Sequence, residues 1–201
     1  SAFCNCNSLS CISIPDKITV IGGGAFSGCD SLTRVDISDL SAWCNIDFKK
    51  SNSNPLCQGG KLFINSVEAT NITIPDNITS IRNYAFCGCE NLITVTIPTS
   101  VTTINKDAFF GCENLSVIEI PESVVKIEYG AFENCTGLTG TLKLPSAMRW
   151  LAKKAFANCT ALTDIQLSES LTEIGYGAFM KCIGLTQLEL PATVKNIGGQ
   201  A

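Results

Sequence analysis

An Ala-Phe pair, with a cysteine three residues after the phenylalanine, recurs along this chain at a spacing that is almost always close to 23 residues. The stretch that starts at Ala25 reads AFSGCDSL, and the one that starts at Ala108 reads AFFGCENL. A fixed period between about 20 and 50 residues predicts a solenoid, in which each unit buries its apolar face only against its neighbours. The phenylalanines of the repeats are Phe3, Phe26, Phe86, Phe109, Phe132, Phe156 and Phe179, with spacings of 23, 60, 23, 23, 24 and 23 residues.

Each unit also carries the pattern of a short β-strand. A leucine lies six residues after each phenylalanine, and two apolar residues that are two positions apart follow it. This alternation is typical of a strand with one face buried. Proline follows most of these pairs, where it can end a strand without removing a ladder hydrogen bond. The predicted strand pairs are Ile12/Ile14, Val35/Ile37, Val95/Ile97, Ile118/Ile120, Leu142/Leu144, Ile165/Leu167 and Leu188/Leu190.

A second apolar pair, with a spacing of three residues, precedes each Ala-Phe, as in Val101 and Ile104. This spacing predicts a short strand or a 3₁₀ turn on the opposite wall of the coil. The residue two positions after the phenylalanine is Gly or Asn in six of the seven units, and these residues best tolerate a left-handed backbone. Lys181 holds this position in the last unit, where we expect strain or a different turn.

These patterns together predict a right-handed, mostly parallel β-solenoid of about eight coils of about 23 residues, which rise about 4.8 Å each. We expect residues 1–201 to form one solenoid. The chain begins with SAF and ends with IGGQA, both inside a repeat, so we expect it to be a fragment of a longer array.

Composition excludes several classes of function. The net charge is −4 and no cluster of Lys and Arg offsets it, which argues against a nucleic-acid partner. The longest apolar run is only a few residues, too short for a segment inserted in a membrane. The chain has no histidine, which removes the commonest general base and the commonest metal ligand. We therefore expect no catalysis and no cofactor.

The chain has 12 cysteines, and seven of them lie at the same place in the repeat. A residue at one place in every coil forms a ladder, and a buried free cysteine there acts as a small hydrophobe. Neighbouring side chains in such a ladder are parallel, which suits disulfide torsions badly. Two Cys-x-Cys pairs resemble zinc ligands, but one member of each belongs to the ladder, so we predict no metal site. The ladder comprises Cys6, Cys29, Cys89, Cys112, Cys135, Cys159 and Cys182.

The gap of 60 residues between Phe26 and Phe86 contains one regular unit and 37 further residues. We assign the irregular insertion to residues 39–69. Its first part has a loosely helical apolar spacing, with Asp39 or Ser41 as the N-cap. Residues 49–60 are expected to form a loop, and residues 61–74 a β-hairpin about Asn65 and Ser66.

Two interpretations of the insertion stay open. An insertion in a solenoid often maps to the binding face. Alternatively, Trp43, Phe48 and Phe63 pack the insertion onto the stack. Cys44 and Cys57 lie in it, outside the ladder, and could form a disulfide in an exported protein, or remain two free thiols.

The stretches LITVTIPTSVTTINKDAFFGC and LSVIEIPESVVKIEYGAFENC resemble the leucine-rich repeats of the BspA-like class, also called the treponemal type. The resemblance covers nearly the whole chain. SNPLCQGGKLFINS resembles a segment that recurs between such repeats, although Asn-Gly is usual where this chain has Asn65-Ser66. The resemblance implies a right-handed leucine-rich-repeat stack in a secreted or surface-anchored protein. It also implies a host matrix protein, a cell-surface protein or the surface of another cell as partner, and it carries no catalytic residues.

The residues between the buried positions of each strand are expected to face outward and form two columns. This exposed sheet is polar and of mixed charge, so a ligand would be held by shape and hydrogen bonds. The alternative is a solvated sheet without a ligand. The candidate binding face consists of Arg34, Asp36, Thr94, Thr96, Val117, Glu119, Thr141, Lys143, Asp164, Gln166, Gln187 and Glu189.

Three functions follow from these patterns. The first is a binding or adhesion module that uses this strand face, the insertion or both. The second is a structural spacer that holds another domain away from the cell surface. The third is an enzyme, which the missing histidine and the absence of a predicted cleft between facing carboxylates argue against.

Overall fold

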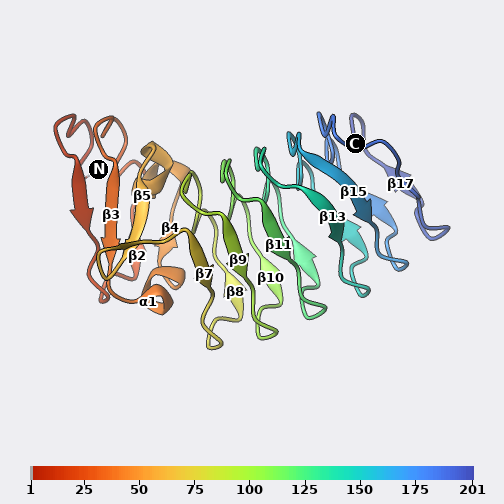
Figure 1. The fold of residues 1–201 in the computed structure, drawn as a ribbon, viewed down its shortest axis with the longest axis horizontal. Helices are drawn as coiled ribbons and strands as arrows, with labels where there is room; N and C mark the ends of the chain where they lie inside the picture. Colours follow the sequence, from red (N-terminus) through yellow and green to blue (C-terminus); the bar gives the residue numbers. More distant parts are fainter. Residues whose placement is uncertain (1) are drawn as a thin grey trace.

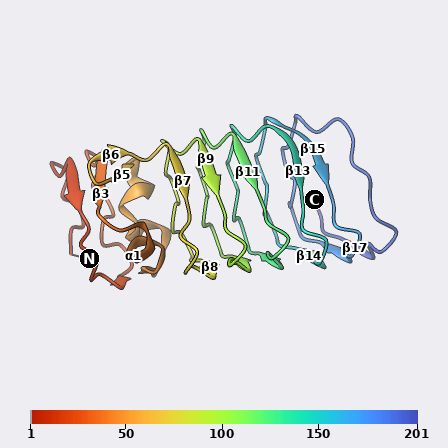
Figure 2. The same cartoon turned by 60° about the horizontal axis from the view of Figure 1, so that its bottom comes forward.

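The computed structural model of the protein describes residues 2–201, and it shows a stack of coils that follow one another along a curved axis (Figures 1 and 2). Each regular coil adds one strand to a first wall and a strand of two residues to a second wall. Strands of successive coils pair in parallel, with partners 23 positions apart in the regular part. The predicted parallel β-solenoid is therefore confirmed.

The first wall contains the longer strands. They form three sheets, in the orders β1-β3-β5-β6, β7-β9-β11 and β13-β15. In the middle sheet Thr94 pairs with Val117, and Thr96 pairs with Glu119. The strands are β1 (Cys11–Ser13), β3 (Arg34–Ile37), β5 (Lys61–Ile64), β6 (Val67–Glu68), β7 (Asn71–Thr73), β9 (Thr94–Thr96), β11 (Val117–Glu119), β13 (Gly140–Lys143) and β15 (Leu162–Gln166).

The second wall is extended in every coil, which decides between the two predicted alternatives in favour of short strands. The 3₁₀ helices of residues 2–201 lie in the insertion instead. The strands of this wall are β2 (Val20–Ile21), β4 (Asp47–Phe48), β8 (Ser80–Ile81), β10 (Thr103–Ile104), β12 (Lys126–Ile127), β14 (Trp150–Leu151), β16 (Glu173–Ile174) and β17 (Asn196–Ile197).

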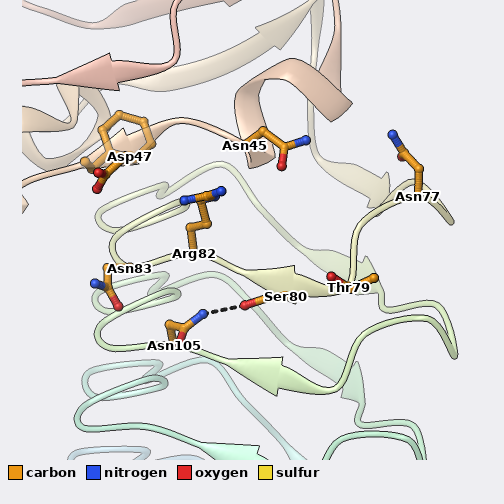
Figure 3. A pocket seen from close by; sticks show the side chains of 9 residues that line it. Asn45, Asp47, Asn77, Thr79, Ser80, Arg82, Asn83 and Asn105 are labelled. Carbon is orange, nitrogen blue, oxygen red and sulfur yellow. Dashed lines mark hydrogen bonds between the residues drawn. The ribbon is translucent and has the colours of Figure 1, made fainter.

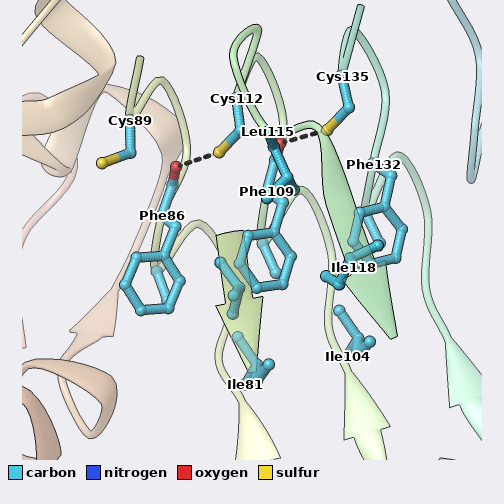
Figure 4. Close-up of a cluster of buried hydrophobic side chains, with 14 of the residues drawn as sticks. Ile81, Phe86, Cys89, Ile104, Phe109, Cys112, Leu115, Ile118, Phe132 and Cys135 are labelled. Carbon is cyan, nitrogen blue, oxygen red and sulfur yellow. Dashed lines mark hydrogen bonds between the residues drawn. The ribbon is translucent and has the colours of Figure 1, made fainter. Parts of the chain in front are cut away.

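The repeated phenylalanines stack inside the solenoid (Figure 4). The rings of Phe86 and Phe109 lie 5.4 Å apart at an interplanar angle of 6°, and those of Phe109 and Phe132 lie 5.3 Å apart at 4°. Phe156 and Phe179 continue this file, while Phe3 and Phe26 form a separate pair 5.2 Å apart. Each fully buried ring contributes about 1.5–3 kcal/mol relative to an exposed one.

The cysteine ladder has a polar role as well as an apolar one. The Sγ atom of Cys112 donates to the carbonyl of Phe86 at 3.1 Å, and that of Cys135 donates to the carbonyl of Phe109 at 3.2 Å (Figure 4). Burial raises the pKa of the Cys135 thiol to about 12, so the thiol stays protonated and able to donate. The predicted ladder of reduced cysteines is confirmed. The same bond joins Cys29 to Phe3, Cys159 to Phe132 and Cys182 to Phe156.

Two left-handed residues flank each phenylalanine from Phe26 to Phe179. The predicted position two residues after it is left-handed in all seven units, including Lys181 at φ 60°. Lys181 therefore makes the same turn as its equivalents and carries strain. The second position, two residues before the phenylalanine, was not predicted because its residue types vary. Its members are Gly24, Tyr84, Asp107, Gly130, Lys154, Gly177 and Gln200.

The insertion is itself an irregular coil of the stack. Its strand β4 pairs with β2 on the second wall, and β5 pairs with β3 on the first wall. Helix α1 (Leu40–Cys44) replaces a turn, with Asp39 as its N-cap, as predicted. The expected loop contains two 3₁₀ helices, η1 (Ser51–Ser53) and η2 (Pro55–Gln58). The predicted hairpin is confirmed as β5 and β6, with Asn65 and Ser66 in the left-handed region.

Side chains close part of the junction between this insertion coil and the next regular coil. Asn91 accepts from the Leu62 amide at 3.0 Å and donates to the carbonyls of Leu62 and Ala69 at 3.0 and 3.1 Å. Trp43 and Asn54 donate to the carbonyl of Ala85 at 3.0 and 3.2 Å. These polar side chains replace backbone bonds that the irregular coil cannot supply in register.

The last coil departs from the prediction. Leu188 and Leu190, the predicted buried pair, are 39% and 48% exposed. Residues 186–190 form no strand, whereas their equivalents in the preceding coils do. Their side chains lie at the end of the stack, where the described residues provide no further coil to cover them.

The corner of the junction gives a direct test of close packing. Gly88 and Gly111 have almost the same φ, 72° and 70°. A methyl group added at Gly88 would lie 2.7 Å from the Cα atom of Cys57. A methyl group added at Gly111 would lie 3.8 Å from its nearest neighbouring atom. We expect Gly88→Ala to lower the free energy of unfolding by about 1–3 kcal/mol more than Gly111→Ala does. Denaturant titration measures both. Equal losses would show that the junction corner is not tightly packed.

Asp107 gives a test of pH dependence. Its Oδ1 atom is buried and has no hydrogen-bond partner among residues 2–201. Burial raises the pKa of this carboxyl to about 6. The positive charges of Lys106 and Lys154 oppose this shift, and the negative charge of Glu133 adds to it. Because the folded state holds the proton more tightly, Asp107 stabilises the fold at pH 4 and this contribution is lost as the pH rises through 6. We expect Asp107→Asn to gain about 1–2 kcal/mol at pH 7 and little at pH 4.

Urea titrations of the parent and of Asp107→Asn between pH 4 and 8 measure this difference, and Asn also tolerates the left-handed backbone of position 107. The exposed Asp30→Asn serves as the control and is expected to change the profile little. A difference between Asp107→Asn and the parent that did not grow with pH would contradict the assignment.

Candidate binding face

The middle of the candidate face is hollowed. Six of the twelve predicted residues lie together along a groove of about 770 Å³ on the first wall. The alternation of β9, β11 and β13 places them there, because Val95, Ile118 and Leu142 between them are buried in the core. Val117 lines this groove and is 53% exposed. The six residues are Thr94, Thr96, Val117, Glu119, Thr141 and Lys143.

A second groove of about 650 Å³ continues the face toward the C-terminus. Lys143 lines both grooves, and Asp164, Gln166, Gln187 and Glu189 line only the second. Gln187 and Glu189 were predicted on a strand, but their segment forms none. Both are exposed at the rim of this groove, on a segment that runs without strand pairing.

Arg34 and Asp36 lie apart from these grooves. Arg34 donates to both oxygens of Asp36 at 2.6 and 2.7 Å, and its guanidinium lies 4.0 Å above the ring of Phe63. The β5-β6 hairpin ends their sheet before β7 begins the next one. The structure therefore separates this pair from the other ten predicted residues, and the pair is largely neutralised within its own coil.

Some polar groups of the two grooves are also paired between coils. Glu122 accepts from the Lys143 ammonium at 3.0 Å and from the Ser146 amide at 2.7 Å, and these bonds lower the pKa of the Glu122 carboxyl to about 2. Thr141 donates to Asp164 at 3.1 Å. The hydroxyl of Thr96 and the carboxylate of Glu119 have no protein partner within residues 2–201. The middle groove thus combines threonine hydroxyls and the free Glu119 carboxylate with an apolar lining that includes Val117, Ile120 and Pro121.

Some residues of this face were missed from the sequence. Asn71 accepts from Thr94 at 2.6 Å and extends the first column, and Thr73 extends the second, because Thr73 pairs with Thr96. Lys61 and Phe63 extend the columns on β5. The signal that could have found Asn71 and Thr73 is the return of the Ile72/Ile74 pair after the insertion.

The predicted pairing of Cys44 with Cys57 is wrong. Cys57 forms a disulfide with Cys87, with Cα atoms 5.5 Å apart, and Cys44 is a free, fully buried thiol. Helix α1 places Cys44 in the core, whereas η2 places Cys57 against the corner that carries Cys87. Burial raises the pKa of Cys44 to about 12. The disulfide adds a covalent link across the junction.

Between residues 2 and 201, no three His, Cys, Asp or Glu side chains come together as metal ligands would. In the same range, no helix has the length and apolar character to cross a bilayer.

The parallel stack, the Leu-x-x-Ile-x-Ile strands and the Ala-Phe corners define a leucine-rich-repeat solenoid. The model of the "BspA type Leucine rich repeat region" matches residues 1–54, 59–141 and 138–201, and the chain belongs to this family. A comparison with curated proteins finds no match.

Solved structures share the fold. A leucine-rich repeat protein from Eubacterium ventriosum is 24% identical with a TM-score of 0.62, and the match covers 96% of this chain and 58% of that one. The leucine-rich repeat protein of T. pallidum is 27% identical with a TM-score of 0.61, over 89% of this chain and 79% of that one. One from Bacteroides ovatus is 27% identical with a TM-score of 0.50, over 97% and 61%. The chain thus spans little more than half of the Eubacterium protein.

Peptide mapping without reductant tests the disulfide. We expect one linked peptide pair that contains Cys57 and Cys87, with Cys44 unlinked. Because the disulfide closes a sequence separation of 30 residues, its removal in a Cys57→Ser/Cys87→Ser variant is expected to lower the free energy of unfolding by about 3–4 kcal/mol. A reducing agent should lower the free energy of unfolding of the parent by the same amount and leave that of the variant unchanged. Cys44 in any linked peptide would contradict the structure.

Proposed function

We propose that this chain is a non-catalytic binding module that holds a protein partner against the two grooves of its first wall. The observation that carries the proposal is that ten of the twelve predicted face residues line these two adjoining grooves. A partner that spans them would contact several coils at once, each about 4.8 Å from the next. Stable protein interfaces need contact of this extent.

The chemistry of the grooves favours a polar partner surface. Exposed threonines donate and accept hydrogen bonds, and Val117 offers an exposed apolar point of contact. Glu119 and Lys143 occupy equivalent positions in successive coils of the middle groove and can position a partner by charge. Such a surface is typical of a binding site that recognises shape and hydrogen bonds.

The disulfide and the family support a location outside the cytoplasm. Disulfides persist in oxidising compartments, and Cys57 and Cys87 are joined. Membership of the BspA type repeat family agrees with a secreted or surface-anchored protein. We accordingly place this chain at a cell surface or in a secreted protein. The partner would be a host matrix protein, a cell-surface protein or the surface of another cell.

A non-catalytic role agrees with the side chains available. The chain has no histidine, and burial raises the pKa of ladder thiols such as Cys89 to about 12, which leaves them protonated and without nucleophilic character. The insertion is less suited to binding than the grooves, because Trp43 and Phe48 are buried in the stack. The alternative role is a rigid spacer for another domain, and the continuous core and the paired walls favour it.

Binding to immobilised matrix proteins and to whole cells tests the proposal. We expect Thr96→Arg and Glu119→Arg each to weaken binding at least about tenfold, because both place a bulky charge in the middle groove. Val125→Arg, at an exposed position next to the second wall, serves as the matched control and should bind like the parent. If both groove variants bind like the parent, the strand face is not the site. If the chain binds none of these targets and only holds a neighbouring domain at a distance, the spacer role applies.

A further inference from the structure

The second wall is open at the junction between the insertion coil and the next regular coil. Elsewhere in this wall, the Thr102 and Asn105 amides donate to the carbonyls of Thr79 and Ile81 at 2.9 and 3.0 Å. The equivalent donors one coil earlier are the amides of Thr79 and Arg82. Neither of them has a partner in the part of the chain that the structure describes, and β8 does not pair with β4.

The acceptors that these amides lack can be identified from the register. The Asp47 and Lys49 amides donate to the carbonyls of Thr19 and Ile21 at 2.8 and 3.2 Å, and Val20 pairs with Asp47. In the insertion coil, Ile46 and Phe48 are therefore the equivalents of Thr19 and Ile21, and their carbonyls are the corresponding acceptors. Two parallel strand edges thus face the same gap with donors on one side and acceptors on the other.

The other sides of the same junction are closed. Asn91 bridges Leu62 and Ala69 on the first wall, while Trp43 and Asn54 cap the corner. The second wall also lacks backbone pairing between β12 and β14, but those strands stay in contact, and the Lys126 ammonium there lies 5.7 Å from the centre of the Trp150 ring. Beside the gap the side-chain amide of Asn77 donates to the Ser41 hydroxyl at 2.7 Å, but among residues 2–201 no backbone bond joins the edges of β4 and β8.

A polar cavity of about 390 Å³ fills the gap (Figure 3). Asn45 and Asp47 line it from the side of the insertion coil, and Thr79, Arg82 and Asn83 line it from the side of β8. Arg82 and Asn83 are exposed, and in the described chain the Arg82 guanidinium makes no ion pair within 4.0 Å. Unpaired strand edges readily pair with another extended chain, and proteins usually cover them.

We propose that this gap, which we call the open rung, binds an extended peptide segment that runs parallel to β4 and β8 and completes the second wall. The carbonyls of the peptide accept from the Thr79 and Arg82 amides, and its own amides donate to the carbonyls of Ile46 and Phe48. Main-chain pairing of this kind supplies affinity, and side chains at alternate positions supply specificity. The outward side chains of the peptide lie between Asp47 and Arg82, which selects polar residues there.

The open rung is separate from the two grooves of the first wall. It lies on the other wall of the solenoid, and none of its lining residues belongs to the candidate binding face. The inference therefore goes beyond the proposed function. A peptide bound here would also restore the missing coil-to-coil contact and stiffen the junction.

A suitable probe is a capped synthetic peptide with the sequence of residues 100–105, SVTTIN, whose β10 segment pairs with the opposite edge of β8 in the protein. In NMR titrations of the labelled protein we expect saturable shifts of the amides of residues 46–48 and 79–82. Hydrogen exchange of the Thr79 and Arg82 amides should be fast in the free protein and slow at least about tenfold with peptide.

Matched variants separate binding from folding. Thr79→Pro removes an unpaired amide, so we expect it to weaken peptide binding at least about tenfold with little change in Tm. Thr102→Pro makes the same change one coil later, where the amide is bonded, and should lower Tm clearly.

Asn83→Trp fills the cavity from an exposed position and should also prevent peptide binding. Thr96→Arg should leave peptide binding intact, and Thr79→Pro should leave first-wall binding intact.

Several outcomes would overturn the open rung. One is the absence of shifts up to the solubility limit of the peptide, and another is a set of shifts confined to the first wall. A third is exchange of Thr79 and Arg82 in the free protein as slow as that of Thr102 and Asn105. If an N-acetylglucosamine oligosaccharide shifts the same amides and the peptide does not, the site is a carbohydrate site and the peptide proposal fails.

Discussion

Backbone hydrogen bonds between equivalent residues of successive coils determine everything else in this solenoid. The Phe86 amide donates to the carbonyl of Ala108 at 2.8 Å, and the Phe109 amide donates to that of Ala131 at 2.9 Å. Because each bond repeats at the period of the sequence, side chains of one kind lie directly above one another. The phenylalanine file, the thiol bonds and the columns of the first wall all follow from this register.

The sequence pattern predicted the strands, the stacking and the reduced cysteine ladder because one residue type recurs at each of those positions. It did not predict the second left-handed position, which is occupied by Tyr84, Asp107 and Lys154 as well as by glycine. Backbone bonds hold that conformation, so residue type carries little signal. The Cys57–Cys87 disulfide was missed for a related reason, since it depends on how the insertion coil lies against the next corner.

The candidate face was predictable residue by residue but not as a surface. Strand alternation assigns Thr96 and Glu119 to the outer side, and the structure agrees. Alternation contains no information on which outward residues share a groove. The hairpin separates Arg34 and Asp36 from the other residues, and Glu122, which lies after the strand, engages Lys143 across the coils.

An irregular coil inside a regular stack has to be joined to neighbours whose register it does not share. Here Asn91 supplies one acceptor and two donor bonds on one side, Trp43 and Asn54 supply donors at the corner, and a disulfide adds a covalent link. Backbone groups that face solvent lose less than buried ones when they stay unpaired. This difference explains why the buried sides of the junction are closed and the solvent-facing second wall stays open. The irregularity that interrupts the regular pairing therefore leaves a polar cavity between the unpaired edges of β4 and β8.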